Sequence, residues 1–168
     1  AKSSRFNIWV NQEGAALAST DVSARVAVTN GVPVIVERAM YLSAGGQFWG
    51  AGHNSAAVAA PATEWFLAEG ATGSYFDLFY LICNPGPTAA TVAVTYLRPA
   101  PAAPVTKTYT VAAASRFNIY VDAEEVPAGS GQWPLANAEV SARLVSTNGV
   151  TVVVERAMWW PGPTAGTW

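Results

Sequence analysis

Apolar and polar residues alternate along most of this chain, in short runs bounded by glycine, proline and asparagine. Valine, threonine and aromatic residues dominate these runs, which is typical of half-buried β-strands. No stretch shows the helical period of about 3.6 residues. From Glu64 onward the pattern predicts seven strands, in EWFLAEG, FDLFYLICN, TVAVTYLR, TKTYTVAA, RFNIYVD, VSARLVST and VTVVVERAMWW. This spacing of turns indicates an all-β, antiparallel sandwich of the immunoglobulin-like kind.

The chain also contains an internal repeat. SRFNIWV at 4–10 returns as SRFNIYV at 115–121, and VSARVAVTNGVPVIVERAMY at 22–41 returns as VSARLVSTNGVTVVVERAMW at 140–159. A repeat of this length is typical of tandem globular domains rather than of short solenoid units.

The repeat predicts two domains. Residues 61–168 are expected to form one complete seven-stranded unit. Residues 1–60 are expected to be the C-terminal half of a preceding unit, with strands near 5–10, 22–29 and 32–41. Three strands alone would expose sheet edges and an apolar face, so, if the chain is complete, something must supply the missing strands.

A Thr-Asn-Gly turn separates the last two predicted strands of each copy. These strands are expected to form a hairpin, in which a three-residue loop with Gly31 or Gly149 in the left-handed bulge position keeps the apolar residues on one face. The register then pairs Leu144 with Val152 and Ala142 with Val154. It also brings together two opposite-charge pairs, Arg143 with Glu155 and Arg25 with Glu37.

Arg38 and Arg156 occupy matching positions near the end of the last strand, on the side expected to face the core. An arginine in such a place can bury its aliphatic stem and bond to loop carbonyls. We interpret both residues as structural anchors rather than as ligand contacts.

Five ordered segments resemble a known type of repeat: EWFLAEG, NPGPTAATVAVTYL, TKTYTVAAASRFNIYV, AEVSARLVSTNGVTVVVERAMWW and FWGAGHNSAAV. They are similar to an uncharacterised tandem repeat of bacterial surface and secreted proteins, with the wording FAEG, NPG, TVTVTY, SR, VERPMY and GGHD. The resemblance implies an extracellular, all-β, non-enzymatic module. This chain departs from it at Ala39 and Ala157, which replace proline, and at Asn54, which replaces aspartate.

The composition argues against several functions. Charged residues make up 12% of the chain, the net charge is −2, and no basic cluster is present, so nucleic acid is not an expected partner. No apolar run is long enough to span a membrane. The resemblance described above implies a cell-surface or extracellular location, and no cofactor is expected.

Candidate catalytic and metal-binding residues are few. His53 is the only histidine, and we interpret it as a loop residue that caps backbone groups between domains. Cys83, the only cysteine, is expected to be a buried, inert thiol. An acidic loop formed by Asp122, Glu124 and Glu125 is expected to be solvated rather than to hold calcium. These features predict no enzyme.

The seven tryptophans are the best case for a ligand. Trp9 and Trp159 align with tyrosines of the other copy, which favours packing. Trp133, Trp160 and Trp168 are the candidates for stacking against a glycan.

Two functions follow. The first is a structural or adhesive module of a linear assembly, such as a stalk, sheath or filament. Its partners would be copies of itself or adjacent repeats, head to tail, and either strand addition by a neighbour or a longer repeat protein could complete the half-unit. The alternative is a carbohydrate-binding module whose partners are cell-wall or surface glycans.

Overall fold

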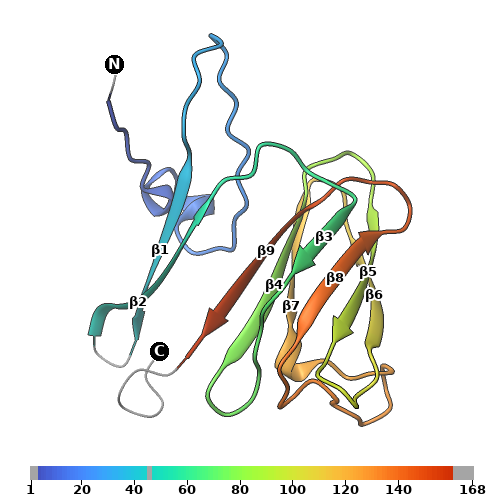
Figure 1. Ribbon diagram of the computed structural model, residues 1–168. Helices are drawn as coiled ribbons and strands as arrows, with labels where there is room; N and C mark the ends of the chain where they lie inside the picture. Colours follow the sequence, from blue (N-terminus) through green and yellow to red (C-terminus); the bar gives the residue numbers. More distant parts are fainter. Residues whose placement is uncertain (1–3, 45–46, 161–168) are drawn as a thin grey trace.

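The computed structural model describes residues 4–44 and 47–160, and its strands form an antiparallel β-sandwich beside a separate hairpin (Figure 1). The hairpin consists of β1 (Glu37–Ala44) and β2 (Gln47–Ala56). The sandwich strands are β3 (Glu64–Leu67), β4 (Asp77–Asn84), β5 (Ala90–Leu97), β6 (Val105–Val111), β7 (Ser115–Tyr120), β8 (Ser141–Ser146) and β9 (Val153–Trp159). Short 3-10 turns lie at Val10–Gln12 (η1), Ala15–Leu17 (η2) and Val121–Ala123 (η3).

The sandwich has a four-stranded sheet in the order β3-β8-β5-β6 and a three-stranded sheet in the order β7-β4-β9. All pairs are antiparallel. The all-β sandwich and the seven predicted strands are therefore confirmed. The central pairs β4–β7 and β5–β8 are those of the immunoglobulin order, whereas the first and last strands, β3 and β9, pair with β8 and β4.

The core lies between the two sheets and follows the predicted alternation. In β4 and β5 every second residue is buried, which is the period of two of a strand with one face on the core. Tyr80 and Tyr96 stack within this core. The Tyr96 hydroxyl lies 2.9 Å from the Tyr109 hydroxyl, so a buried polar group finds a partner.

The predicted hairpin between the last two strands is wrong. β8 lies in the four-stranded sheet and β9 in the three-stranded sheet, so Leu144 pairs with Trp65 and Val94 instead of Val152. The turn at Gly149 carries the chain from one sheet to the other. The alternation of apolar and polar residues in β8 and β9 is compatible with this crossing, because each strand still directs its apolar residues to the shared core.

The strands predicted near residues 5–10 and 22–29 are not formed, and only the end of the strand predicted at 32–41 appears, as part of β1. The corresponding strands of the complete unit explain this difference. β7 and β9 both pair with β4, and β8 pairs with β3 and β5. The three corresponding segments of the first copy therefore have no reason to pair with one another, and the strands they would pair with are not available.

The chain enters the complete unit at one end of the sandwich and leaves it at the other. Ala62, just before β3, exchanges two backbone hydrogen bonds of 2.9 Å with Val152, just before β9. β9 then runs away from this point to Trp159 at the opposite end of the sandwich (Figure 1).

Asn84, the last residue of β4, explains why this strand ends in an Asn-Pro-Gly sequence. Its side chain is fully buried and its amide nitrogen donates to the carbonyls of Thr88, Val111 and Ala112 at 2.8, 3.1 and 3.0 Å. Its oxygen accepts a hydrogen bond of 3.0 Å from the Gly86 amide. One side chain thus ties the turn after β4 to the end of β6.

We expect Asn84→Ala to lower the free energy of unfolding by about 2–4 kcal/mol, because buried carbonyls lose their donor. Asn84→Asp should destabilise further at neutral pH, because a carboxylate would face those carbonyls. Urea unfolding measures both changes. The matched control is Asn54→Ala, on an exposed residue of β2, expected to cost less than about 0.5 kcal/mol. Equal effects at the two asparagines would contradict this role.

Candidate interface between the repeats

The outer face of the three-stranded sheet is unusually apolar. Because Leu78, Tyr80 and Ile82 face the core, the residues between them point outward, and these include Phe79 and Leu81. Phe79 stacks on Tyr120 of β7, with ring centroids 4.7 Å apart. The alternate residues of β4 are only partly accessible, whereas Tyr120 is 39% exposed.

The β1–β2 hairpin contacts the part of this face formed by β9 and the start of β4. Ala157 pairs with Phe79 on the outer face of β9, yet its exposed fraction is only 2%. Leu42 of β1 lines a shallow hollow together with Asp77, Phe79 and Trp159. The first copy of the repeat therefore lies against the outer face of the second (Figure 1).

Glu155 is the polar centre of this contact. One of its carboxylate oxygens accepts hydrogen bonds from the Arg38 guanidinium and, at 3.1 Å, from the Ser55 hydroxyl. The same oxygen lies 3.3 Å from Nδ1 of His53. All four side chains are at least partly buried, so the charged pair is screened less than a surface ion pair. This cluster joins residues that lie about a hundred positions apart in the chain.

His53 lies in strand β2, and its prediction as a loop residue is therefore wrong. Its Nδ1 is 2.7 Å from the Arg38 guanidinium, which can only donate, so the neutral ring accepts this hydrogen bond. Burial and the positive charges of Arg38 and Arg156 lower the pKa of His53, while Glu155 opposes the shift. Because the Ser55 hydroxyl bonds to Glu155 and not to the ring, this group does not form a nucleophile–base pair.

A second contact links the two copies at the other side of the three-stranded sheet. Asn118 of β7 donates to the Asp21 carboxylate at 2.8 Å, and the Arg116 guanidinium lies 3.5 Å from the same group. Asp21 is mostly exposed. The contact is therefore weaker than the one at Glu155.

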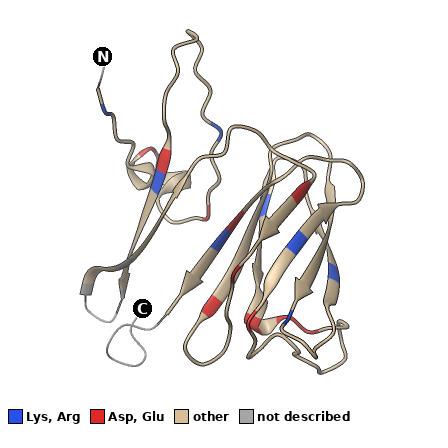
Figure 2. Cartoon of the chain, viewed as in Figure 1, with Lys and Arg blue, Asp and Glu red and all other residues tan. Residues whose placement is uncertain are grey.

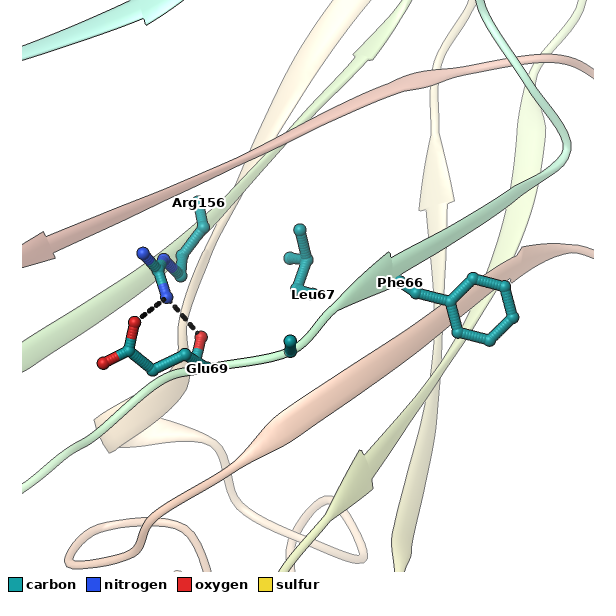
Figure 3. Close-up of a pocket in the computed structure, with 5 residues that line it drawn as sticks. Phe66, Leu67, Glu69 and Arg156 are labelled. Atoms are coloured by element: carbon teal, nitrogen blue, oxygen red, sulfur yellow. Dashed lines mark hydrogen bonds and ion pairs between the residues drawn. The ribbon is translucent and has the colours of Figure 1, made fainter.

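Arg156 has different partners from its counterpart Arg38. Its guanidinium donates to the Glu69 carbonyl at 2.6 Å and to the Glu69 carboxylate at 3.3 Å. The carbonyl contact is of the kind expected for an anchoring arginine. Arg156 and Glu69 border a hollow of about 400 Å³ that Phe66, Leu67 and Ala68 also line (Figure 3). In this view the Phe66 ring points away from Arg156.

The two predicted charge pairs do not form. Arg143 bonds to Glu64 of the neighbouring strand at 2.7 Å, because β8 and β9 lie in different sheets. Within the described residues Arg25 and Glu37 make no ion pair, and both are exposed. Gly31 and Gly149 have φ values of 74° and 78°, the left-handed conformation predicted for these two turns.

The acidic loop is not simply solvated. Asp122 accepts hydrogen bonds of 2.9 Å from the amides of Gly73 and Leu78, although burial raises the pKa of Asp122. Glu124 pairs with Lys107, and bonds from the amides of Gly131 and Gly129 lower the pKa of Glu125. Each carboxylate thus has partners of its own: Asp122 holds the segment that leads into β4, Glu124 contacts strand β6, and Glu125 holds the loop of Gly129 and Gly131. Across residues 4–44 and 47–160, no cluster of three or more metal-ligating side chains occurs.

The aromatic candidates are dispersed. Trp133 and Trp160 are exposed and make no ring–ring contact within the described part of the chain, and Trp168 lies outside the described residues. Trp65 is partly buried and donates to the Val152 carbonyl at 3.0 Å. Cys83 is free and half-buried on the outward side of β4.

Charged residues are few and scattered over both parts of the molecule (Figure 2). None of the helices in the described residues is long and apolar enough to cross a membrane.

No protein-family model matches the chain, and no curated protein matches it. Among solved structures the chain is similar to the Anabaena sensory rhodopsin transducer, with 22% identity and a TM-score of 0.48. The match covers 60% of this chain and 92% of that chain.

The interface should weaken as the pH falls. Burial is the largest cause of the lowered pKa of His53 and outweighs the opposing charge of Glu155. Because this burial is lost on release, protons bind better to the released hairpin, where the pKa moves back toward the ordinary value of about 6.5. Docking is therefore strongest above about pH 6.5 and declines as the pH falls toward the lowered value. An NMR titration of the His53 ring should give a midpoint below 6.5.

Arg38→Ala should raise that midpoint toward 6.5, because it removes a positive neighbour and loosens the hairpin. Arg25→Ala is the matched control, since Arg25 is exposed and makes no ion pair within the described residues. A midpoint at or above 6.5 in the unmodified chain would contradict the docked arrangement of Arg38 and His53.

Proposed function

We propose that this chain is a non-enzymatic, extracellular structural module of a linear assembly built from repeated β-sandwich units. The observation that supports it is the internal repeat together with the contact between its two copies, centred on Glu155. Neighbouring units in such an assembly would adhere through the outer face of a three-stranded sheet.

The first copy behaves as a unit that lacks its first half. Its apolar residues are exposed where their counterparts in the complete unit are buried. The exposed fractions are 61% for Ile8 and 1% for Ile119, 57% for Val26 and 1% for Leu144, and 57% for Val34 and 1% for Val152. Burying each of these side chains would contribute about 2 kcal/mol. Strands equivalent to β3, β4 and β5 are what these segments need.

The number of half-units of the repeat indicates where those strands could come from. Residues 1–168 hold one first half, β3 to β6, and two second halves, at residues 4–41 and 115–159. Strand exchange between copies of residues 1–168 would therefore always leave one second half unpaired. Completion requires an additional first half with the pattern of β3 to β6, so we favour adjacent repeats over exchange between identical chains.

A direct test joins an extra copy of residues 61–114 ahead of Ser4, which recreates the junction between Ala114 and Ser115. We expect the amides of residues 4–36 to exchange more slowly with deuterium, because they would enter the two sheets. Binding of a hydrophobic dye should fall as Ile8, Val26 and Val34 become buried. The control is the same fusion with Leu78→Asp in the added copy, which spoils its core.

The linear shape of the proposed assembly is tested by measuring the length of particles with different numbers of units. Particles with two and with four complete units, viewed by negative-stain electron microscopy, should lengthen in proportion to the number of units. Unchanged amide exchange in the fusion, or compact particles whose longest dimension does not grow, would contradict the proposal.

The alternative, a carbohydrate-binding module, has one observation in its favour: Trp133 and Trp160 are exposed. Aromatic rings in such positions can stack on sugars. A glycan array in which Trp133→Ala abolishes binding, while the units fail to form elongated particles, would favour this function.

A further inference from the structure

The outer edge of β9 carries unpaired backbone groups. β9 pairs with β4 on one side only, and no other strand of the described chain pairs with it. Such an edge is a ready template for another strand.

The direction of the backbone groups defines the available edge. Val152 exchanges both of its hydrogen bonds with Ala62 and not with β4. Because both backbone groups of a residue in an antiparallel strand point to the same side, and sides alternate, Val154, Arg156 and Met158 direct theirs to the same outer edge. These three residues therefore present free donors and acceptors over most of β9.

Strand β1 shows the same edge with a partner in place. The ERAM sequence of β1 at 37–40 is identical to that of β9 at 155–158. β2 pairs with β1 in a register that places Ser55 opposite Arg38 and His53 opposite Met40. Ala57 also donates to the Val36 carbonyl at 3.0 Å, and Val36 corresponds to Val154. The edge that β2 occupies on β1 is thus the edge that is open on β9.

A hollow beside this edge has room for side chains of an added strand. It is bordered by Arg156 and by residues 66–69 of the β3 end (Figure 3). On β1 the guanidinium of Arg38 contacts the His53 ring, at 2.7 Å. An equivalent histidine on β9 would lie next to Arg156, at the mouth of this hollow.

We propose that the outer edge of β9 is a peptide-binding site for an extended segment with the chemistry of residues 47–58, QFWGAGHNSAAV. The segment adds as an antiparallel strand in the register that β2 has on β1. Its serine lies opposite Arg156, its histidine opposite Met158, and its backbone satisfies the free groups of Val154, Arg156 and Met158. This site is separate from the assembly proposed above and does not require it.

Glycine at the position of Gly52 gives the site its sequence preference. A Cβ atom added to Gly52 would lie 2.9 Å from the backbone oxygen of Met40, closer than real contacts allow. The corresponding oxygen on β9 is that of Met158. A bulkier residue at this position of the incoming strand would therefore push the two backbones apart.

The test uses the full chain with a synthetic peptide of residues 47–58, and the same peptide fused to the C-terminus through a flexible linker. The fusion raises the effective concentration to the millimolar range. Amide exchange followed by NMR should slow at Arg156 and Met158. The expected slowing is about tenfold when the free peptide is at ten times its dissociation constant.

Two controls make the result specific. A peptide with Gly52→Val should fail to slow these amides. In the chain, Met158→Pro removes an outward donor without touching the ladder to β4, and should abolish the effect while the β4 signals stay in place.

Three outcomes would overturn the proposal. The first is no slowing at Arg156 and Met158 with the fused peptide. The second is equal slowing with the Gly52→Val peptide. The third is protection already present without peptide that disappears on dilution, which would mean that another copy of the chain occupies the edge.

Discussion

The arrangement of this protein depends on one constraint of strand pairing: β7, β8 and β9 never pair with one another. β7 and β9 lie on either side of β4, and β8 lies between β3 and β5. A second half therefore cannot form a sheet by itself, whatever its propensity for β-structure. The first copy demonstrates this, because residues with nearly the same sequence as β7 and β8 form no strands when β3 to β6 are lacking.

Local pattern was sufficient to predict every strand of the complete unit, because each strand has a buried face and a clear alternation. It was sufficient for Gly31 and Gly149 as well, since their turns require a left-handed residue. It failed at the connection from β8 to β9. A hairpin and a crossing between sheets place the same residues on the core, so alternation could not distinguish them.

The contact between the two copies could not be predicted from the sequence, for a related reason. Arg38 and Arg156 occupy identical local sequences, yet one bonds to Glu155 and the other to Glu69. Their partners depend on which strands are present, which is a property of tertiary structure. One feature of the sequence could have indicated the contacted face. Strands β4 and β9 carry apolar residues on both sides, with Phe79 and Ala157 on the outer face.

The path of the chain through the complete unit has a mechanical consequence. The chain enters beside the start of β9, at the Ala62–Val152 bridge, and leaves at the far end of β9. A pull along the chain is therefore directed parallel to β9. It must shear the whole ladder between β9 and β4 at once, where a pull across the strands would unzip one hydrogen bond after another. In the assembly that we propose, a string of such units would resist tension along its length.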